Sequence, residues 1–218
     1  MTHLLWFLNR GTGVVLVAVL TLSVALGVLA TAPGGSRRWP RFALQTLHRN
    51  ISLLACALLL AHAVSPVLDS YVSHYAAVTW LDVAVPFVSA YKTLGLGLGT
   101  LALDLIAVIV LTSLARQRFS HRTWFRLHLL TYVSWALGVV HGLLVGTDAR
   151  TSWGLAVTAA SIVVVAVAVV VRLLPRRGRA VAVPVTGSLA HLEAGASGPA
   201  GPLPPEHGRR RAGRGARV

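Results

Sequence analysis

Four histidines lie inside long apolar stretches of this sequence, and they form two similar arrangements. The stretch LHRNISLLACALLLAH (47–62) carries His48 and His62, fourteen residues apart, and LHLLTYVSWALGVVH (127–141) carries His128 and His141, thirteen residues apart. An imidazole can bind a metal through a ring nitrogen, exchange a proton near neutral pH, or take part in hydrogen bonds. Because an ionisable side chain is costly inside a membrane, residues of this kind are expected to have a function.

The elements that must position these histidines are apolar helices. The chain has 218 residues, of which 55% are hydrophobic and only 12% are charged, and its mean hydropathy is +0.70. A helix that crosses the hydrocarbon core of a membrane needs about 20 predominantly apolar residues. Five runs meet this condition, at 12–31, 47–66, 94–114, 127–146 and 153–173. We therefore predict an all-α integral membrane protein, a bundle of five transmembrane helices in the lipid bilayer.

The N-terminal run could be either a signal peptide or the first membrane helix. The segment ATAPGG (30–35) offers a small-residue cleavage site, but the apolar run before it is long for a signal peptide. The basic segment RRWPR (37–41) directly behind it is typical of a stop-transfer flank. We expect an uncleaved helix.

The basic residues predict the orientation, because Lys and Arg flank membrane helices mainly on the cytoplasmic side. The connection after the first run carries Arg37, Arg38 and Arg41, with Arg49 at the start of the second run, and the connection after the third run carries Arg116, Arg118, Arg122 and Arg126. In contrast, 67–93 has Lys92 as its one Lys or Arg. The N-terminus is therefore expected outside the cell membrane and the C-terminus in the cytoplasm. Much of the formal net charge of +14 lies in 176–218, which is rich in Gly, Pro and Arg. We predict a membrane domain over 1–175, a disordered cytoplasmic tail over 176–218, and no binding of nucleic acid.

This topology places the four histidines at two depths. The second and fourth helices run in the same direction, so His48 and His128 are expected near the cytoplasmic face, and His62 and His141 near the outer face. The two levels are roughly 20 Å apart along a helix that rises 1.5 Å per residue. A pair of imidazoles at each level is the ligand set that two stacked haems with two axial histidines each require.

Helix periodicity favours the first spacing over the second. At 100° per residue, fourteen residues bring His62 to within about 40° of the face that carries His48, whereas thirteen residues leave His141 about 140° away from His128. A tilt of the helix, a local distortion near its glycines 138 and 142, or approach from different sides of the cofactor would absorb this difference.

Two other interpretations compete with haem ligation. Zinc is disfavoured, because each level offers only two histidines and no nearby carboxylate or cysteine to complete four ligands. Taken singly, each histidine is better explained as a hydrogen-bonded residue inside the bundle, and only the matched pairs favour ligation. The remaining histidines lie in termini or connections and are expected to be solvated or interfacial: His3, His74, His121, His191 and His207.

The apolar stretches resemble the ferric reductase-like transmembrane domain, which occurs in ferric reductases, NADPH oxidases and the haem subunit of periplasmic methionine sulfoxide reductase. The segments that carry the resemblance, within residues 4–173, are WFLNRGTG (6–13), LHRNISLLACALLLAH (47–62), PFVSAYKTLGLGLGTLALDL (86–105) and RTWFRLHLLTYVSWALGVVHGLLVGTD (122–148). The resemblance implies that the histidines are axial ligands of two b-type haems, as in a cytochrome b. The implied pairs are His48 with His128 on the cytoplasmic side and His62 with His141 on the outer side.

The sequence departs from this family after residue 173. Full-length reductases and oxidases continue into a flavin and nicotinamide domain, whereas this chain shows no strand pattern and no GxGxxG fingerprint there. The glycine-rich segment GLGLGT (95–100) opens a membrane helix, and close helix packing explains it better than phosphate binding. Electrons are therefore expected from a separate flavoprotein reductase, which would supply FAD and NAD(P)H, or from a quinol.

Three arginines close to the ligand candidates have two possible roles. Arg49 follows His48 directly, and Arg122 and Arg126 precede His128 by a few residues. Each could bind haem propionates through charge-assisted hydrogen bonds, or could simply be part of the positive flank of a membrane helix.

Further candidates lie within the membrane helices. Asp104 is a carboxylate in the third helix, which would serve a proton or propionate network or a hydrogen bond to a neighbouring helix. Trp124, Tyr132 and Trp135 are best explained as core and interfacial aromatic residues, with contact to a porphyrin as the alternative.

The sequence as a whole predicts transmembrane electron transfer of the ferric reductase-like kind. Electrons would pass from a cytoplasmic donor through two bis-histidine b haems, held between the second and fourth helices, to an acceptor outside, either ferric iron or a reductase. An alternative of the same class is a haem subunit that feeds a periplasmic or extracellular partner reductase. An alternative of another class is a transporter or structural membrane protein without haem. No Ser/His/Asp, paired-carboxylate or cysteine-based catalytic arrangement is visible in the sequence.

Overall fold

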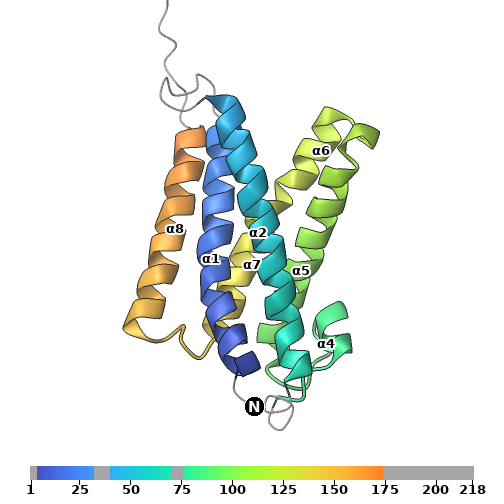
Figure 1. Cartoon of the computed structure of the whole chain (residues 1–218), viewed down its shortest axis with the longest axis vertical. Helices are drawn as coiled ribbons and strands as arrows, with labels where there is room; N and C mark the ends of the chain where they lie inside the picture. Colours follow the sequence, from blue (N-terminus) through green and yellow to red (C-terminus); the bar gives the residue numbers. More distant parts are fainter. Residues whose placement is uncertain (1–3, 32–39, 70–75, 174–218) are drawn as a thin grey trace, which may run out of the picture. The chain divides into compact units, whose positions relative to one another are not determined.

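Long α-helices account for most of this computed structural model, which describes residues 4–31, 40–69 and 76–173. The helices are α1 (Leu4–Thr31), α2 (Arg41–Leu68), α4 (Trp80–Ala84), α5 (Thr93–Leu114), the 3₁₀ helix η1 (Arg116–Arg118), α6 (His121–His128), α7 (Leu130–Val145) and α8 (Ser152–Leu173) (Figure 1). The described part contains no β-strand, so the all-α prediction is confirmed. The predicted tail at 176–218 lies outside the described residues.

Five helical segments are long and apolar enough to cross a membrane, as the sequence predicted: α1, α2, α5, α6 with α7, and α8. Large apolar side chains on these helices remain exposed, including Leu53 (63%), Leu60 (62%) and Leu111 (63%). A water-soluble protein rarely leaves so much apolar surface in contact with water. The fold is therefore compatible with a membrane protein whose outer faces meet lipid.

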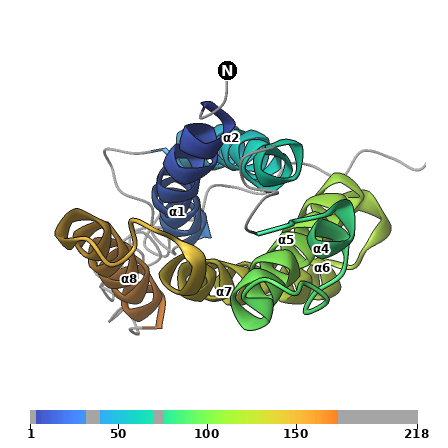
Figure 2. The same cartoon turned by 90° about the horizontal axis from the view of Figure 1, so that it is seen from below.

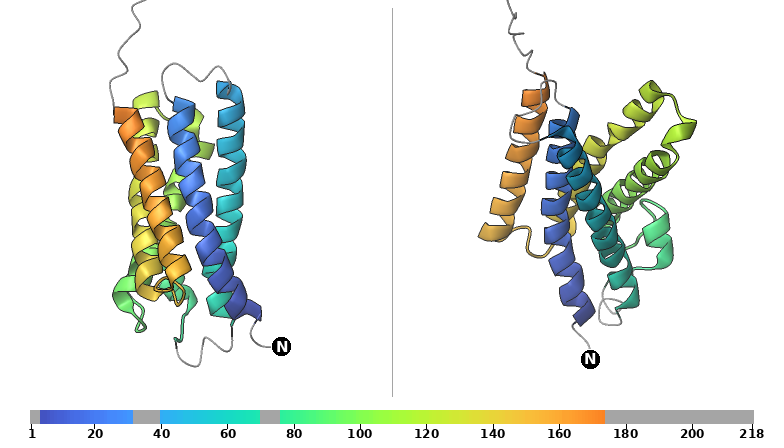
Figure 3. Two further views of the ribbon diagram at one scale, coloured as in Figure 1. Left: turned by 90° about the vertical axis from the view of Figure 1, so that its left-hand side faces the viewer. Right: turned by 45° about the horizontal axis from the view of Figure 1, so that its top comes forward.

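The spanning helices form two closely packed pairs, α1 with α2 and α5 with α7. Helix α1 also contacts α7 and α8, and so connects the pairs (Figure 2). Figure 3 shows α1 and α2 running side by side along most of their length. The histidine-bearing helices, α2 and α6 with α7, thus each pack along a different partner helix, α1 or α5.

Small polar residues lie where the helices approach each other. Ser134 of α7 is fully buried, and its Oγ donates to the carbonyl of Ala102 in α5 at 2.9 Å. Trp135 Nε1 donates to Oγ1 of Thr21 in α1 at 3.0 Å. Small side chains allow close approach of two helix backbones, and hydrogen bonds between helices fix their register.

The fourth spanning segment is interrupted at Leu129, between α6 and α7. The N–H of Tyr132 donates to the carbonyl of Leu129, three residues back, at 3.1 Å, and Oγ1 of Thr131 donates to the carbonyl of His128 at 2.7 Å. A three-residue turn advances the helix by more than 100° per residue and changes the face that follows. Helix α7 is continuous through its two glycines, so the irregularity lies at Leu129 and not near Gly138 or Gly142.

The connection before α5 packs against that helix through α4. The carboxylate of Asp82 accepts hydrogen bonds from the N–H and Oγ1 of Thr79 at 2.7 and 2.8 Å, which caps α4. Oγ1 of Thr100 in α5 donates to the carbonyl of Asp82 at 2.6 Å. The ring of Phe87 lies against Gly97, where a β-carbon would clash with it. These contacts hold the first turns of α5, which contact one of the histidines.

Candidate histidine-pair site

The structure brings the four histidines together in the two pairs that the sequence indicated. His48 of α2 lies beside His128 of α6, with ring centroids 6.2 Å apart and ring planes at 75°. His62 of α2 lies beside His141 of α7, with ring centroids also 6.2 Å apart and planes at 84°. The irregular turn at Leu129 lies between the two histidines of the fourth segment, so that both pairs reach the same spacing despite the thirteen-residue interval.

The spacing fits one metal ion between the two rings of each pair. A metal–imidazole bond of about 2 Å on each side, plus roughly 1 Å from each nitrogen to its ring centre, separates two opposed axial imidazoles by roughly 6 Å. Direct contact between two aromatic rings falls in an overlapping range of about 4.5–7 Å. The hydrogen bonds of the rings are therefore needed to tell which nitrogen atoms are available as ligands.

Three of the four rings donate a hydrogen bond from Nδ1 to a backbone carbonyl. His48 Nδ1 lies 2.9 Å from the carbonyl oxygen of Ser23, His62 Nδ1 lies 3.1 Å from that of Asn9, and His141 Nδ1 lies 2.8 Å from that of Gly95. A carbonyl oxygen only accepts, so Nδ1 carries the proton and the lone pair of Nε2 is free to bind a metal. Metal-bound histidines commonly make a hydrogen bond of this kind with the other ring nitrogen.

A glycine lies beneath each of these three rings, four residues after the accepting carbonyl. A β-carbon at Gly13 would lie 3.1 Å from His62 Cε1, one at Gly27 would lie 3.3 Å from His48 Cε1, and one at Gly99 would lie 2.5 Å from His141 Nδ1. We call this combination of carbonyl and glycine a histidine seat. The three seats are Asn9 with Gly13 for His62, Ser23 with Gly27 for His48, and Gly95 with Gly99 for His141.

His128 is held in a different way. Its Nδ1 is buried and has no hydrogen-bond partner among the described residues. Its ring stacks on Trp124, with centroids 5.0 Å apart and planes at 23°, and the guanidinium of Arg116 lies 4.6 Å from the centre of the Trp124 ring. Stacking fixes the plane of the ring but gives Nδ1 no acceptor.

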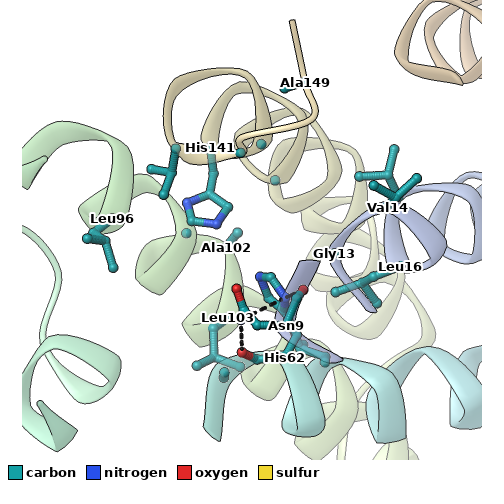
Figure 4. A pocket seen from close by; sticks show the side chains of 18 of the residues that line it. Asn9, Gly13, Val14, Leu16, His62, Leu96, Ala102, Leu103, His141 and Ala149 are labelled. Carbon is teal, nitrogen blue, oxygen red and sulfur yellow. Dashed lines mark hydrogen bonds between the residues drawn. The ribbon is translucent and has the colours of Figure 1, made fainter. Parts of the chain in front are cut away.

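The His62/His141 pair lies in a cavity of about 300 Å³. Figure 4 shows the two rings projecting into it from different helices, with Gly13 of α1 and Ala102 and Leu103 of α5 around them. A volume of this size is at the lower end of small-molecule and cofactor sites, which are mostly apolar with a few polar groups.

Two polar contacts join helices at the wall of this cavity. The side chain of Asn9 donates to the carbonyl of His62 at 2.9 Å, while its own carbonyl accepts from the same residue's ring, so this clamp joins α1 to α2. The guanidinium of Arg10 forms an ion pair with the carboxylate of Asp148, through Nε at 2.9 Å and through Nη2, and stacks 4.3 Å from the centre of the Trp6 ring. Arg10 and Asp148 both line the cavity and join α1 to the segment between α7 and α8.

The comparison with known protein families now identifies the chain's relatives. Residues 4–148 match a family described as a domain of unknown function (DUF8596). The chain belongs to this family. No curated protein and no solved structure matches the chain.

The DUF8596 match covers all four histidines, the three seats and the Arg10–Asp148 ion pair. It leaves out α8, which contributes a few residues to the wall of the cavity and no ligand candidate. Because the family is described as one of unknown function, membership of it assigns no activity to the chain.

The other predicted residues of this DUF8596 chain lie around the pairs rather than in them. Arg49, Arg122 and Arg126 are exposed, and Asp104 is half-buried in α5. Trp135 lines the cavity while bonded to Thr21, whereas Trp124 contacts a ligand candidate directly. Tyr132 is half-buried in α7.

The donor set decides which metal group these pairs fit. The described residues contain no group of three or more His, Cys, Asp or Glu side chains that could hold a metal ion. Two neutral imidazoles on opposite sides of one ion leave four positions to another ligand, and a porphyrin supplies four nitrogens in one plane. Each pair therefore offers the two axial ligands that a haem takes, whereas it offers two of the four ligands of a tetrahedral zinc site.

Proposed function

We propose that this chain transfers electrons across the cell membrane through two haems b, one held by His48 and His128 and the other by His62 and His141. The observation that carries the proposal is the equal 6.2 Å spacing of two histidine pairs at different levels of one apolar bundle. Three of the four rings also hold their protons on Nδ1, which leaves Nε2 for iron.

The residues of the chain orient the ligands and exclude water. The carbonyls of Asn9, Ser23 and Gly95 fix the tautomer and the rotation of the rings, so little reorganisation is needed when a ligand bond forms. The apolar helices keep the surroundings of low polarity, which together with axial ligation determines the reduction potential. When bound, haem iron supplies one-electron chemistry.

Electron flow runs from a cytoplasmic donor to an acceptor outside in this proposal, following the positive-inside orientation. The donor is a separate flavoprotein reductase or a quinol, and the acceptor is ferric iron or a partner reductase. If histidines hold the iron at both levels, an acceptor would receive electrons at a haem edge.

The absorption spectrum of the purified full chain tests the proposal. We expect a reduced b-type spectrum and two haems per chain by pyridine haemochrome assay. His62→Ala should remove the haem of the His62/His141 pair and leave the other haem in place. His48→Ala should remove the haem of the His48/His128 pair and leave that of His62/His141. His191→Ala is the matched control, because His191 lies in 176–218, outside the apolar stretches that carry the two pairs. A haem-free preparation, or His62→Ala with both haems intact, would refute the assignment.

A further inference from the structure

The seats on α1 repeat at a fixed interval. Gly13 and Gly27 are fourteen residues apart, as are His62 and His48 on the antiparallel neighbour α2. Fourteen residues return a helix to within about 40° of its starting face. One helix therefore presents two equivalent seats to the two histidines of the other.

The same interval on α5 leads to a different residue. Fourteen residues after Gly95 is Ile109, and fourteen residues after Gly99 is Ser113. Ile109 is buried, and α5 packs against α6, which carries His128. A fourth seat, for His128, would by helix register have the carbonyl of Ile109 as its acceptor and residue 113 at its glycine position. This residue is a serine, Ser113.

Two orphaned atoms mark this fourth position. Ser113 Oγ and His128 Nδ1 are both buried, and neither has a hydrogen-bond partner among the residues that the structure describes. At the other seats, a β-carbon in place of the glycine would lie 2.5–3.3 Å from the ring. By analogy, a serine side chain at this position is expected to keep the ring of His128 from the carbonyl of Ile109. The ring of His128 stacks on Trp124.

The missing hydrogen bond has a chemical consequence for a ligand histidine. An acceptor at Nδ1 makes the imidazole more basic and fixes the tautomer that leaves Nε2 free. Without it, a bond from Nε2 to haem iron would be weaker, and the ferric state would be less stabilised relative to the ferrous state.

We propose that Ser113 is a positioning residue that makes His128 the exchangeable ligand, so that a small diatomic molecule binds iron at the His48/His128 level and not at the His62/His141 level. The inference rests on the proposed function and deepens it, since it assigns different properties to the two levels. The His48/His128 level is also the one with the higher reduction potential.

The test uses the full chain with both haems reduced by dithionite and carbon monoxide as the probe. We expect the wild-type chain to bind carbon monoxide at one of its two haems. Ser113→Gly completes the fourth seat, so it should weaken carbon monoxide binding roughly tenfold, the lower end of the effect of removing an outer hydrogen-bond partner of a ligand. Ser113→Ala is the matched control: it removes the hydroxyl but keeps a β-carbon, and should bind carbon monoxide as the wild type does.

A redox titration supplies an independent readout. Ser113→Gly should lower the higher of the two midpoint potentials by about 59 mV, which is a tenfold change for a one-electron couple, and should leave the lower one unchanged. Two haems per chain without carbon monoxide binding, binding at both haems, or a Ser113→Gly chain that behaves as the wild type would overturn this inference alone. A haem-free chain would overturn the proposed function and the inference together.

Discussion

The glycines beneath the histidines allow a graded test of the seats. An alanine β-carbon at position 99 would lie 2.5 Å from His141 Nδ1, whereas ordinary contact begins at 3.4 Å, so the ring must move by 3.4 − 2.5 = 0.9 Å. The corresponding movement is 3.4 − 3.1 = 0.3 Å at Gly13 and 3.4 − 3.3 = 0.1 Å at Gly27. Distances from a metal to its ligands are held within about 0.2 Å. Gly99→Ala therefore displaces His141 by much more than this tolerance, and Gly13→Ala displaces His62 by slightly more. The displacement of His48 by Gly27→Ala stays within the tolerance.

The expected result is a stepwise change in haem content. Gly27→Ala should keep two haems per chain, Gly13→Ala should weaken retention of one, and Gly99→Ala should lose the haem bound by His141. Gly99→Ala should also cost about 1–3 kcal/mol of stability from overpacking, and a similar amount from the strained or broken bond between His141 and the carbonyl of Gly95. Alanine is the better helix former by about 1 kcal/mol, so a loss cannot come from a weakened helix.

Haem per chain by pyridine haemochrome assay, measured together with thermal unfolding in detergent, decides the outcome. Gly11→Ala is the control, because the glycine is exposed on α1 and has nothing within 4 Å of an added β-carbon. Full haem content in Gly99→Ala would show that the seat does not position His141. An equal loss in all three seat variants would show that general helix packing, and not the distance to the ring, controls the site.

Three further predictions concern the cavity, the ion pair and the orientation. Gly138 lines the cavity and has nothing within 4 Å of an added β-carbon. Gly138→Leu should therefore displace one haem, with the helix content measured by circular dichroism unchanged. Two retained haems and a raised melting temperature would instead mean that the leucine fills an empty space that holds no haem. The Arg10–Asp148 ion pair is partly exposed, with side-chain exposures of 30% and 17%, so a double-mutant cycle on thermal unfolding should give a coupling below about 1 kcal/mol, and a coupling of several kcal/mol would contradict this. Reporter fusions should place the C-terminus in the cytoplasm, and a C-terminal reporter active only outside would reverse the assigned direction of electron flow.

The apolar runs were sufficient to predict the five spanning helices, but not where they begin. The sequence placed the first helix at 12–31, whereas α1 begins at Leu4. In the sequence, Asn9 and Arg10 look like the polar flank of a membrane helix. A polar residue is accommodated within such a helix when it has a hydrogen-bond partner, and the sequence does not show which residues have one. In the structure Asn9 binds His62 and Arg10 binds Asp148, so both are accommodated within the helix.

The histidine pairing could be inferred from depth and direction, because two parallel helices place residues of matching position side by side. The seats could not, since every residue has a carbonyl and the sequence gives no sign of which one accepts a ring N–H. One signal was available for the glycines: Gly13 and Gly27 have the same fourteen-residue interval as His48 and His62. The thirteen-residue interval between His128 and His141 suggested different helix faces, because an ideal helix was assumed. The helix is interrupted at Leu129, where Thr131 and Tyr132 form hydrogen bonds to carbonyls three residues back.

The position of the seats explains why helices without histidines matter to the site. The ligand candidates lie on α2 and on α6 with α7, but the carbonyls and glycines that orient three of them lie on α1 and α5. His48, His62 and His141 are thus each fixed by a hydrogen bond to a helix that packs directly against their own, whereas His128 is held by stacking on Trp124. The separation of the His62/His141 pair then depends on how α1 holds His62 and α5 holds His141, whereas in the His48/His128 pair a seat holds His48 alone. Both pairs have ring centroids 6.2 Å apart although the intervals between their histidines differ. Substitutions on α1 and α5 should accordingly alter the retention or the spectrum of a haem although they replace none of its histidines.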